Sequence, residues 1–395
     1  MSKMKHKMPG HGLPDVEFEG RLTLAQKAMT AAKLDGLVVT SPHNVRYFTG
    51  FESQFWESPT RPWYVIVPRV GKITLTFPEI GVPAIQGKSF VGEILSWPAP
   101  RPADDGITTM AAALGKLKSK FGRVGWEFGR EMLVRAPRTD VDAMAKQARG
   151  IEFVDGSPVI WGLRQVKSAA EIDRIRQACQ IGSRAFATLG KRLRIGDTAR
   201  EATRKMAMAM LEHGADHVPF LALIAGKGGY SQIIAGPSDK PIKPGDVLIV
   251  DAGCTYDGYF CDFDRNFAFS KLTDAARRAH EAVWEATKAG MAAARPGATM
   301  ADLLRAMTRE LERVGSLGNN VGRMGHGLGM QLTEPPSIMA GDPGRLVPGM
   351  VMTIEPGMEY APGRMIVHEE NIAITDDGFE LLTTRAPREM WSVTE

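Results

Sequence analysis

Apolar and polar positions follow two patterns in the first 160 residues of the chain. Short apolar runs predict four buried strands, at residues 36–40, 64–68, 73–77 and 124–126. Longer stretches with apolar residues at helical spacing predict three helices, at residues 22–34, 108–121 and 131–147. Residues 41–46 predict a loop. Strands that alternate with helices are typical of an α/β domain, and we expect this one to comprise residues 1–160.

The second part of the chain begins with a helix-start signal and contains an internal repeat. Ser168 and Glu171 have the spacing of a capping box, which predicts a helix to about Leu193. Residues 194–214 and 295–315 align at a constant offset of 101, with six of 21 positions identical. We therefore expect a second domain, residues 161–395, that is built from two similar halves.

Three aspartates lie on a predicted hairpin in the second domain. An apolar strand at residues 247–250 ends in Asp251, a turn signal follows at residues 255–258, and the next strand carries Asp262 and Asp264. One register of the turn sets Asp251 opposite Asp262, and the other sets it opposite Asp264. In both registers two carboxylates face each other, which is unfavourable unless a cation lies between them.

A second predicted hairpin repeats this arrangement. Glu355 and Glu369 are opposite each other if the hairpin is centred on Pro362. Between the two hairpins, His326 stands in a GHGLG segment whose glycines allow close backbone approach. Each residue also has a structural alternative, since a lone aspartate at a strand end is usually a turn former. Taken together, four carboxylates and a neutral imidazole are balanced by two divalent cations, and bridging carboxylates are typical of hydrolytic two-metal sites.

Composition narrows the remaining possibilities. With 395 residues, 44% of them hydrophobic and 24% charged, the chain is an ordinary globular protein of two domains. Its net charge of +4 is mild, so we expect no nucleic-acid partner. No apolar run is long enough to span a membrane, so we expect no membrane association. The three cysteines fit no paired framework, which suggests a reducing, cytoplasmic location.

Several motifs resemble those of the pita-bread metallohydrolases, the family of prolidase, aminopeptidase P, methionine aminopeptidase and creatinase. The segments that carry the resemblance are LRQVKSAAEIDRIRQA, DAGCTYDGYFCDFDRNF, GHGLG, PGMVMTIEPG and HEENIAITDDGFELLT. In the first domain, HNVRYFTGF resembles the creatinase/prolidase N-terminal domain. The resemblance implies an α/β (α+β) chain, with a creatinase-like N-terminal α/β domain and a C-terminal pita-bread domain.

The resemblance also implies a set of five metal ligands: Asp251, Asp262, His326, Glu355 and Glu369. They would hold two divalent transition metals, and oxygen and nitrogen ligands suit Mn, Co, Fe or Zn. The implied reaction is hydrolysis of a peptide or amide C–N bond by metal-activated water, with Glu355 as general base and His326 as the other catalytic residue. Creatinase works without metal because its ligands are not retained, so their retention here argues against a creatinase mechanism.

The groups that surround the ligands in the peptidases are replaced in this chain. Peptidase members carry histidines where the chain has Ile234, Gly322 and Thr333, and an arginine where it has Val367. In the peptidases those groups hold the substrate carbonyl and stabilise the tetrahedral intermediate. The candidates for substrate binding in this chain, each with a structural alternative, are His217, Arg323, Thr333 and His368.

Two other functions stay open from the sequence. Dimethylsulfoniopropionate lyase has a related scaffold, but Leu332 stands where the lyase has an aspartate base, so the match is weaker. A non-catalytic binding module would have lost metal ligands, and all five are present here.

The N-terminal domain contributes a further expectation about partners. We expect a homodimer that acts on a small peptide or small-molecule substrate, because in resembling dimers the N-terminal domain of one subunit reaches the site of its neighbour. The stretch at residues 55–63 is rich in tryptophan, and Trp56 and Arg61 are its candidates for substrate binding.

Overall fold

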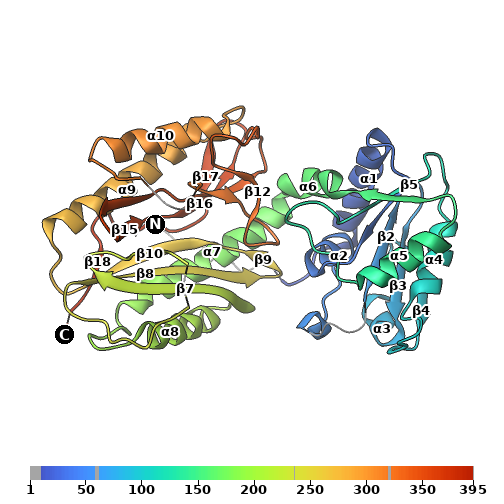
Figure 1. Ribbon diagram of the computed structural model, residues 1–395, viewed down its shortest axis with the longest axis horizontal. Helices are drawn as coiled ribbons and strands as arrows, with labels where there is room; N and C mark the ends of the chain where they lie inside the picture. Colours follow the sequence, from blue (N-terminus) through green and yellow to red (C-terminus); the bar gives the residue numbers. More distant parts are fainter. Residues whose placement is uncertain (1–9, 58–61, 235, 319–321, 395) are drawn as a thin grey trace. The chain divides into compact units, whose positions relative to one another are not determined.

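The computed structural model describes residues 10–57, 62–234, 236–318 and 322–394 (Figure 1). The chain forms two compact units, one of residues His11–Arg164 and one that contains Gln165–Glu395. Among the helices of the described residues, none has both the length and the apolar composition needed to cross a membrane.

The N-terminal unit contains a six-stranded mixed sheet in the order β4-β3-β2-β1-β5-β6. Its strands are β1 (Gly36–Val39), β2 (Tyr64–Pro68), β3 (Ile73–Pro78), β4 (Val91–Trp97), β5 (Arg123–Trp126) and β6 (Glu152–Asp155). The four predicted strands are confirmed, and they form the centre of the sheet. The two edge strands were not predicted, because their mixed burial leaves no continuous apolar run.

The helices before Ala169 are α1 (Asp15–Ala31), α2 (Pro42–Thr49), α3 (Val82–Ile85), α4 (Ile107–Gly115), α5 (Arg138–Gln147) and α6 (Ser157–Gln165), with 3-10 turns η1 (Gln54–Glu57) and η2 (Glu79–Gly81). Three predicted helices are present, but their bounds differ. The first begins earlier than predicted, after Pro14, and the second ends early, at Gly115. The third begins only after Pro137, because the residue before a proline is disfavoured in the helical conformation.

The loop predicted at residues 41–46 is wrong, because these residues begin α2. The side chain of Ser41 accepts a hydrogen bond from the Asn44 amide (3.3 Å), and Pro42 occupies the first turn, where its missing N–H leaves no bond unmade. The buried carboxylate of Glu127 also accepts hydrogen bonds from the side chains of Asn44 (2.7 Å) and Ser41 (2.5 Å). This tertiary contact adds to the local capping by Ser41 and Pro42 and stabilises the helix start.

The C-terminal unit confirms the internal repeat. Helix α7 (Ala169–Leu189) begins with the predicted capping box of Ser168 and Glu171, and is followed by α8 (Ala199–Glu212). Helix α9 (Asp274–Ala293) is likewise followed by α10 (Met300–Glu312), which starts at the same offset of 101 residues from α8. Both short helices begin with a threonine capping box.

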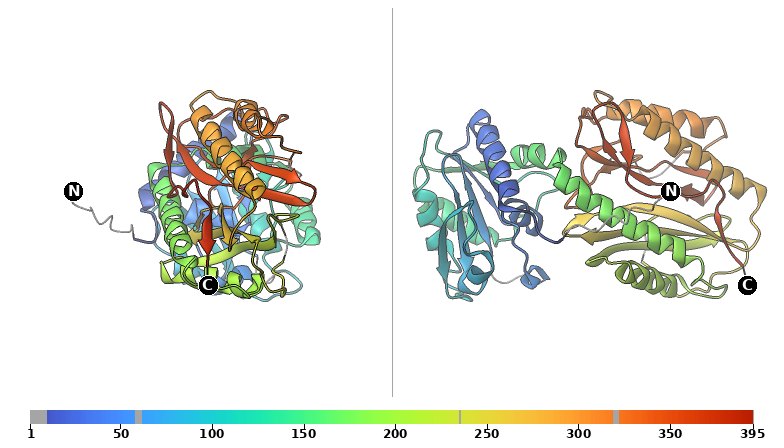
Figure 2. Two further views of the ribbon diagram at one scale, coloured as in Figure 1. Left: turned by 90° about the vertical axis from the view of Figure 1, so that its left-hand side faces the viewer. Right: turned by 180° about the vertical axis from the view of Figure 1, so that it is seen from behind.

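Three sheets lie between these helix pairs (Figures 1 and 2). One has the order β18-β10-β8-β7 with β9 beside β8, one has the order β12-β11-β13-β16-β17, and one pairs β14 with β15. The strands are β7 (His217–Lys227), β8 (Asp246–Tyr256), β9 (Tyr259–Phe260), β10 (Phe263–Phe269), β11 (His326–Gly327), β12 (Glu334–Ser337), β13 (Val351–Ile354), β14 (Gly357–Ala361), β15 (Arg364–Val367), β16 (Glu370–Ile374), β17 (Phe379–Leu381) and β18 (Trp391–Val393). Helices α7 and α8 pack on β8 and β7, whereas α9 packs on β13, β14 and β15.

A buried ion pair joins the start of this unit to the sheet that carries His326. The ammonium of Lys167 lies 3.0 Å from a carboxylate oxygen of Glu334, and their side chains are only 2% and 1% exposed. The amide of Lys167 donates to the carbonyl of Gly349, and Glu334 also accepts from the amide of Gln331. The pair therefore ties the segment before α7 to the start of β12 and to the loop that precedes it.

Removing one partner of this pair tests that assignment. We expect Lys167→Met to lower the free energy of unfolding by about 3–5 kcal/mol, because it removes the ammonium that is paired with the buried Glu334 carboxylate. Urea unfolding measures this change. Lys116→Met, which breaks an exposed pair with Glu93, is the control and should cost less than about 1 kcal/mol. Equal losses in the two variants would contradict the prediction.

A second test concerns the buried histidine of α9. His280 is 4% exposed, and neither ring nitrogen has a hydrogen-bond partner. Burial, together with the charges of His368 and Arg265, lowers the pKa of His280 from 6.5 to about 3. The unfolded chain binds a proton at this residue below about pH 6.5, whereas the folded protein does not until about pH 3.

The folded state should therefore lose about 1.4 kcal/mol per pH unit through this residue as the pH falls from 6.5 towards 3. We expect His280→Phe to remove that component. Urea unfolding of the wild type and of His280→Phe at pH 7 and at pH 5 gives the free energy of unfolding of each protein. The difference between the two proteins should change between the two pH values. A constant difference between the two proteins at both pH values would show that His280 does not titrate in this way.

Candidate metal centre

The first hairpin adopts the second of its two predicted registers. Asp251 on β8 lies opposite Asp264 on β10, and the register with Asp262 opposite Asp251 is wrong. The centre of the turn is Asp257–Gly258, where φ is 50° and 78°. Positive φ at both central positions is the two-residue turn that matches strand twist, and this turn sets the register. Asp262 precedes β10 directly and stays on the face of Asp264.

The second hairpin places its two glutamates as predicted. Ile354 pairs with Glu370 between β13 and β16, and Gly357 pairs with Val367 between β14 and β15. Both pairs follow the register in which Glu355 is opposite Glu369. The second arm of this hairpin is not one continuous strand, because the chain leaves one sheet after Val367 and enters another at Glu370. Glu355 and Glu369 lie at this change of sheet.

The glycines beside His326 let β11 pack closely on its neighbours. Gly325 has a φ of 131°, and a side chain there would collide with the carbonyl of Thr353. The amide of His326 donates to the Thr353 hydroxyl (3.1 Å), and its Nδ1 lies 2.9 Å from the carbonyl oxygen of Gly327. That carbonyl can only accept, so Nδ1 carries the proton. The lone pair of Nε2 is therefore available to a metal.

These elements bring three predicted ligands together. Asp262, His326 and Glu369 each offer one ligand atom, and these atoms lie within 4.8 Å of one another. The Nε2 atom of His326 is 3.5 Å from Oδ2 of Asp262. One oxygen each of Asp251, Asp262 and Glu369 is buried without a hydrogen-bond partner. Buried carboxylate oxygens are rarely left unpaired, so this donor set fits a divalent cation.

The charges of the carboxylates around His326 also favour a bound cation. Burial raises the pKa of Asp251 well above its ordinary value, and the charges of Asp262 and Glu355 raise it further. Burial likewise raises the pKa of Glu369, with Asp262 and Glu355 as the next causes. These carboxylates repel one another in a dry environment, and a bound cation would relieve the repulsion.

Glu355 has a different surrounding from the other carboxylates. Burial raises its pKa to about 7, although the charges of His326 and Arg323 lower it. Arg323 donates to the hydroxyl of Thr333 (3.2 Å). Two of the predicted substrate-binding residues, Arg323 and Thr333, thus contact each other, and the charge of Arg323 acts on Glu355.

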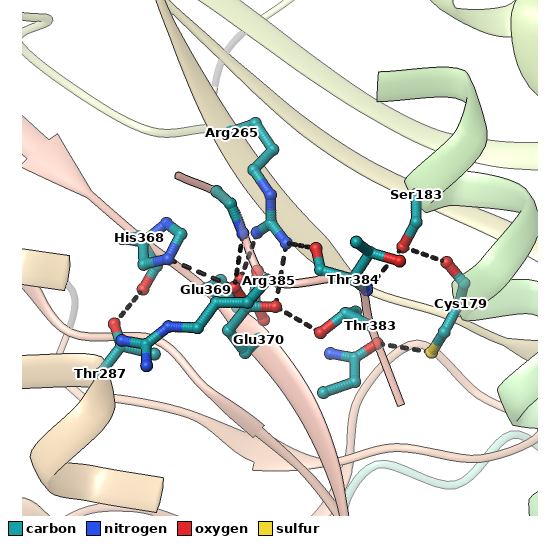
Figure 3. A network of polar contacts seen from close by, with 12 residues as sticks. Cys179, Ser183, Arg265, Thr287, His368, Glu369, Glu370, Thr383, Thr384 and Arg385 are labelled. Carbon is teal, nitrogen blue, oxygen red and sulfur yellow. Dashed lines mark hydrogen bonds and ion pairs between the residues drawn. The ribbon is translucent and has the colours of Figure 1, made fainter. Parts of the chain in front are cut away.

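A buried network behind Glu369 was missed by the sequence analysis (Figure 3). The guanidinium of Arg265 donates to the carbonyls of Glu369 (2.6 Å) and Asp264 (2.7 Å), and to the carboxylate of Glu370 (2.9 Å). Burial opposes ionisation of Glu370, but Arg265 and His368 outweigh it and lower its pKa to about 2. Arg265 therefore connects the backbones of both hairpins. Its only sequence signal is its position, one residue after Asp264.

His368 belongs to this network rather than to the carboxylate cluster. It is 0% exposed, its Nε2 lies 3.3 Å from the Glu370 carboxylate, and its ring meets that of His280. The Thr287 hydroxyl donates to its carbonyl (3.0 Å). The structure does not bring His368 to the metal-ligand candidates, so we do not retain it as a substrate-binding residue.

The structure describes the local surroundings of two further substrate-binding candidates, His217 and Trp56. His217 is exposed at the start of β7, opposite Thr255. Trp56 lies in the N-terminal unit, where its ring packs against Phe51 and Trp63. Arg61 lies outside the described residues.

Comparison with known proteins identifies the family. The family model of metallopeptidase family M24 matches residues 173–376, just over half of the chain, and that of the creatinase/prolidase N-terminal domain matches residues 21–166. The probable dipeptidase PepE of Mycobacterium tuberculosis is 29% identical over 378 residues, covering 94% of this chain and 96% of the relative. An uncharacterized peptidase of Staphylococcus saprophyticus is 26% identical over 364 residues, covering 92% and 99%.

Solved structures agree with this assignment. The dipeptidase PepE from Mycobacterium ulcerans has a TM-score of 0.82 and 27% identity, covering 97% of this chain and 100% of that one. The prolidase from Pyrococcus furiosus has a TM-score of 0.77 and 26% identity, covering 92% and 100%. The predicted fold, a creatinase-like N-terminal domain followed by a pita-bread domain, is confirmed. The chain belongs to metallopeptidase family M24 and is a metal-dependent hydrolase.

Proposed function

We propose that the chain is a dinuclear metallohydrolase that cleaves small peptides. The five residues proposed to hold the two metals are Asp251, Asp262, His326, Glu355 and Glu369. The observation that carries this proposal is the set of buried carboxylate oxygens that lack a hydrogen-bond partner around Nε2 of His326. Mn, Co, Fe and Zn all suit these ligands.

The residues of the chain divide the catalytic work between them. Bound metals would supply a water that is nucleophilic near neutral pH and would polarise the scissile carbonyl. We propose Glu355 as the general base, which accepts a proton from the attacking water and returns it to the leaving amine. His326 presents Nε2 in a fixed orientation, because its Nδ1 is held by the Gly327 carbonyl.

The substrate side differs from that of the peptidases described above. Thr333 stands where they carry a histidine, and it accepts a hydrogen bond from Arg323. Arg323 is therefore positioned to orient a carbonyl or carboxylate beside Glu355. The relatives that match this chain include proteins named dipeptidase and prolidase, so we propose a dipeptide substrate, with Arg323 in place of the missing histidine.

The domain boundary and the assembly are further proposals. We propose two domains, of residues 1–160 and 161–395. In support, one compact unit ends at Arg164, close to the proposed boundary, and the other continues from Gln165. We also propose a homodimer in which Trp56 of the N-terminal domain completes the site of the neighbouring subunit. Sedimentation measures whether the chain is a dimer, and the kinetics of Trp56→Ala measure whether this side chain contributes to the site.

The three cysteines Cys179, Cys254 and Cys261 are buried and free, in keeping with the cytoplasmic location that we propose.

Replacement of one ligand tests the metal assignment. We expect the wild-type chain to hold two divalent metals and Asp262→Ala to lose at least one of them, together with its activity, because Asp262 belongs to the closest group of ligand atoms. Elemental analysis measures the metal and dipeptide hydrolysis measures the activity. Asp239→Asn, at an exposed ion pair with Arg200, is the control and should change neither. Unchanged metal content in Asp262→Ala would refute this ligand set.

A second substitution tests the substrate side. Loss of a group that stabilises the transition-state oxyanion costs about 10²–10³ in rate, so we expect the wild type to cleave Xaa-Pro dipeptides slowly. Thr333→His should raise kcat/KM for those dipeptides while leaving metal content unchanged. Steady-state kinetics of the wild type and of Thr333→His measure this change in kcat/KM. If the wild type already reaches about 10⁵ M⁻¹s⁻¹, an ordinary enzyme value, the replaced histidine is not needed.

A further inference from the structure

Asp264 is a fifth carboxylate beside the proposed metal centre, and the set of five ligands does not include it. It lies directly opposite Asp251 across the β8–β10 ladder. It also follows Asp262 by two residues, so both side chains point to the same face of the strand. Opposite residues of an antiparallel pair have Cβ atoms about 4.5–5.5 Å apart. One cation with metal–oxygen bonds of about 2.0–2.2 Å can therefore reach carboxylates on both strands.

The surroundings of Asp264 give its carboxylate no partner in the protein. The residue is 1% exposed, and its Oδ1 has no hydrogen-bond partner. The adjacent cation, Arg265, directs its guanidinium to the carbonyl of Asp264 rather than to the carboxylate, and it forms an ion pair with Glu370 at 2.9 Å. The positive charge of Arg265 is thus already matched by another buried acid.

Asp257 shows what a structural aspartate in the same hairpin looks like. It is also buried, with 5% exposed, but its carboxylate lies 3.3 Å from the guanidinium of Arg174. Asp257 therefore has a cation in direct contact with its carboxylate, whereas Oδ1 of Asp264 is buried without a hydrogen-bond partner. The contrast indicates that Asp264 requires a partner that the folded chain does not itself contain.

We propose that Asp264 is a further carboxylate of the metal centre, which shares with Asp251 the cation held between β8 and β10. This inference rests on the proposed dinuclear site. A fifth carboxylate makes the donor set richer in hard oxygen ligands, which favours Mn²⁺ over Zn²⁺.

Metal binding to Asp264→Asn tests the proposal without any activity assay. The metal-free proteins are titrated with Mn²⁺ and with Zn²⁺, the affinities are measured by calorimetry, and bound Mn²⁺ is followed by electron paramagnetic resonance. We expect the more weakly held Mn²⁺ to lose about 10–100-fold in affinity, and Zn²⁺ to lose less. The rise in Tm on addition of Mn²⁺ should shrink, while the Tm of the metal-free protein should stay equal or rise because a buried charge is gone.

Asp257→Asn is the matched control in the same hairpin. It should lower the Tm of the metal-free protein, because Arg174 loses its partner, but leave the Mn²⁺ affinities unchanged. Asp264→Ser provides a second, smaller neutral side chain if the asparagine variant does not fold. Two Mn²⁺ ions bound by wild type and by the Asp264 variants with equal affinity would overturn the role of Asp264 and leave the proposed function intact. A wild-type chain that binds no divalent metal would overturn both.

Discussion

Repulsion among buried carboxylates is the constraint on which the C-terminal unit depends. Asp251, Asp262 and Glu369 approach one another from two hairpins, and each has an oxygen without a hydrogen-bond partner. Burial and mutual repulsion both raise the pKa of Asp251 and Glu369, so the empty arrangement is unfavourable. The helix pairs and sheets around the cluster hold the carboxylates in place until a cation stabilises them, as metal-dependent hydrolysis requires.

Arg265 and Glu370 show how the fold holds those carboxylates without occupying them. Arg265 binds the backbone carbonyls of Asp264 and Glu369, and its charge is matched by Glu370 rather than by a ligand carboxylate. The oxygens that face the cluster are therefore left for a metal. The buried Arg265–Glu370 ion pair can thus fix the positions of the proposed ligands without neutralising their carboxylates, which stay able to bind a cation.

The two sides of the site differ in how closely they follow the family. The proposed ligands occupy two hairpins and a glycine-flanked histidine loop, and family M24 matches this whole region. On the substrate side, Thr333 accepts a hydrogen bond from Arg323 where peptidase members carry a histidine. Under the proposed function, the residues that activate water follow the family pattern, while Arg323 and Thr333 would orient the substrate.

The sequence by itself determined both domains, the central strands, the repeat and the candidate ligands, because these follow from local periodicity, capping and resemblance to a family. It left the first hairpin with two registers, and only the positive φ at Asp257 and Gly258 decided that Asp251 faces Asp264. It did not show that the side chain of His368 lies in the network of Arg265 and Glu370. Side chains on different sheets meet there, and such contacts are decided by tertiary packing, which no local pattern records.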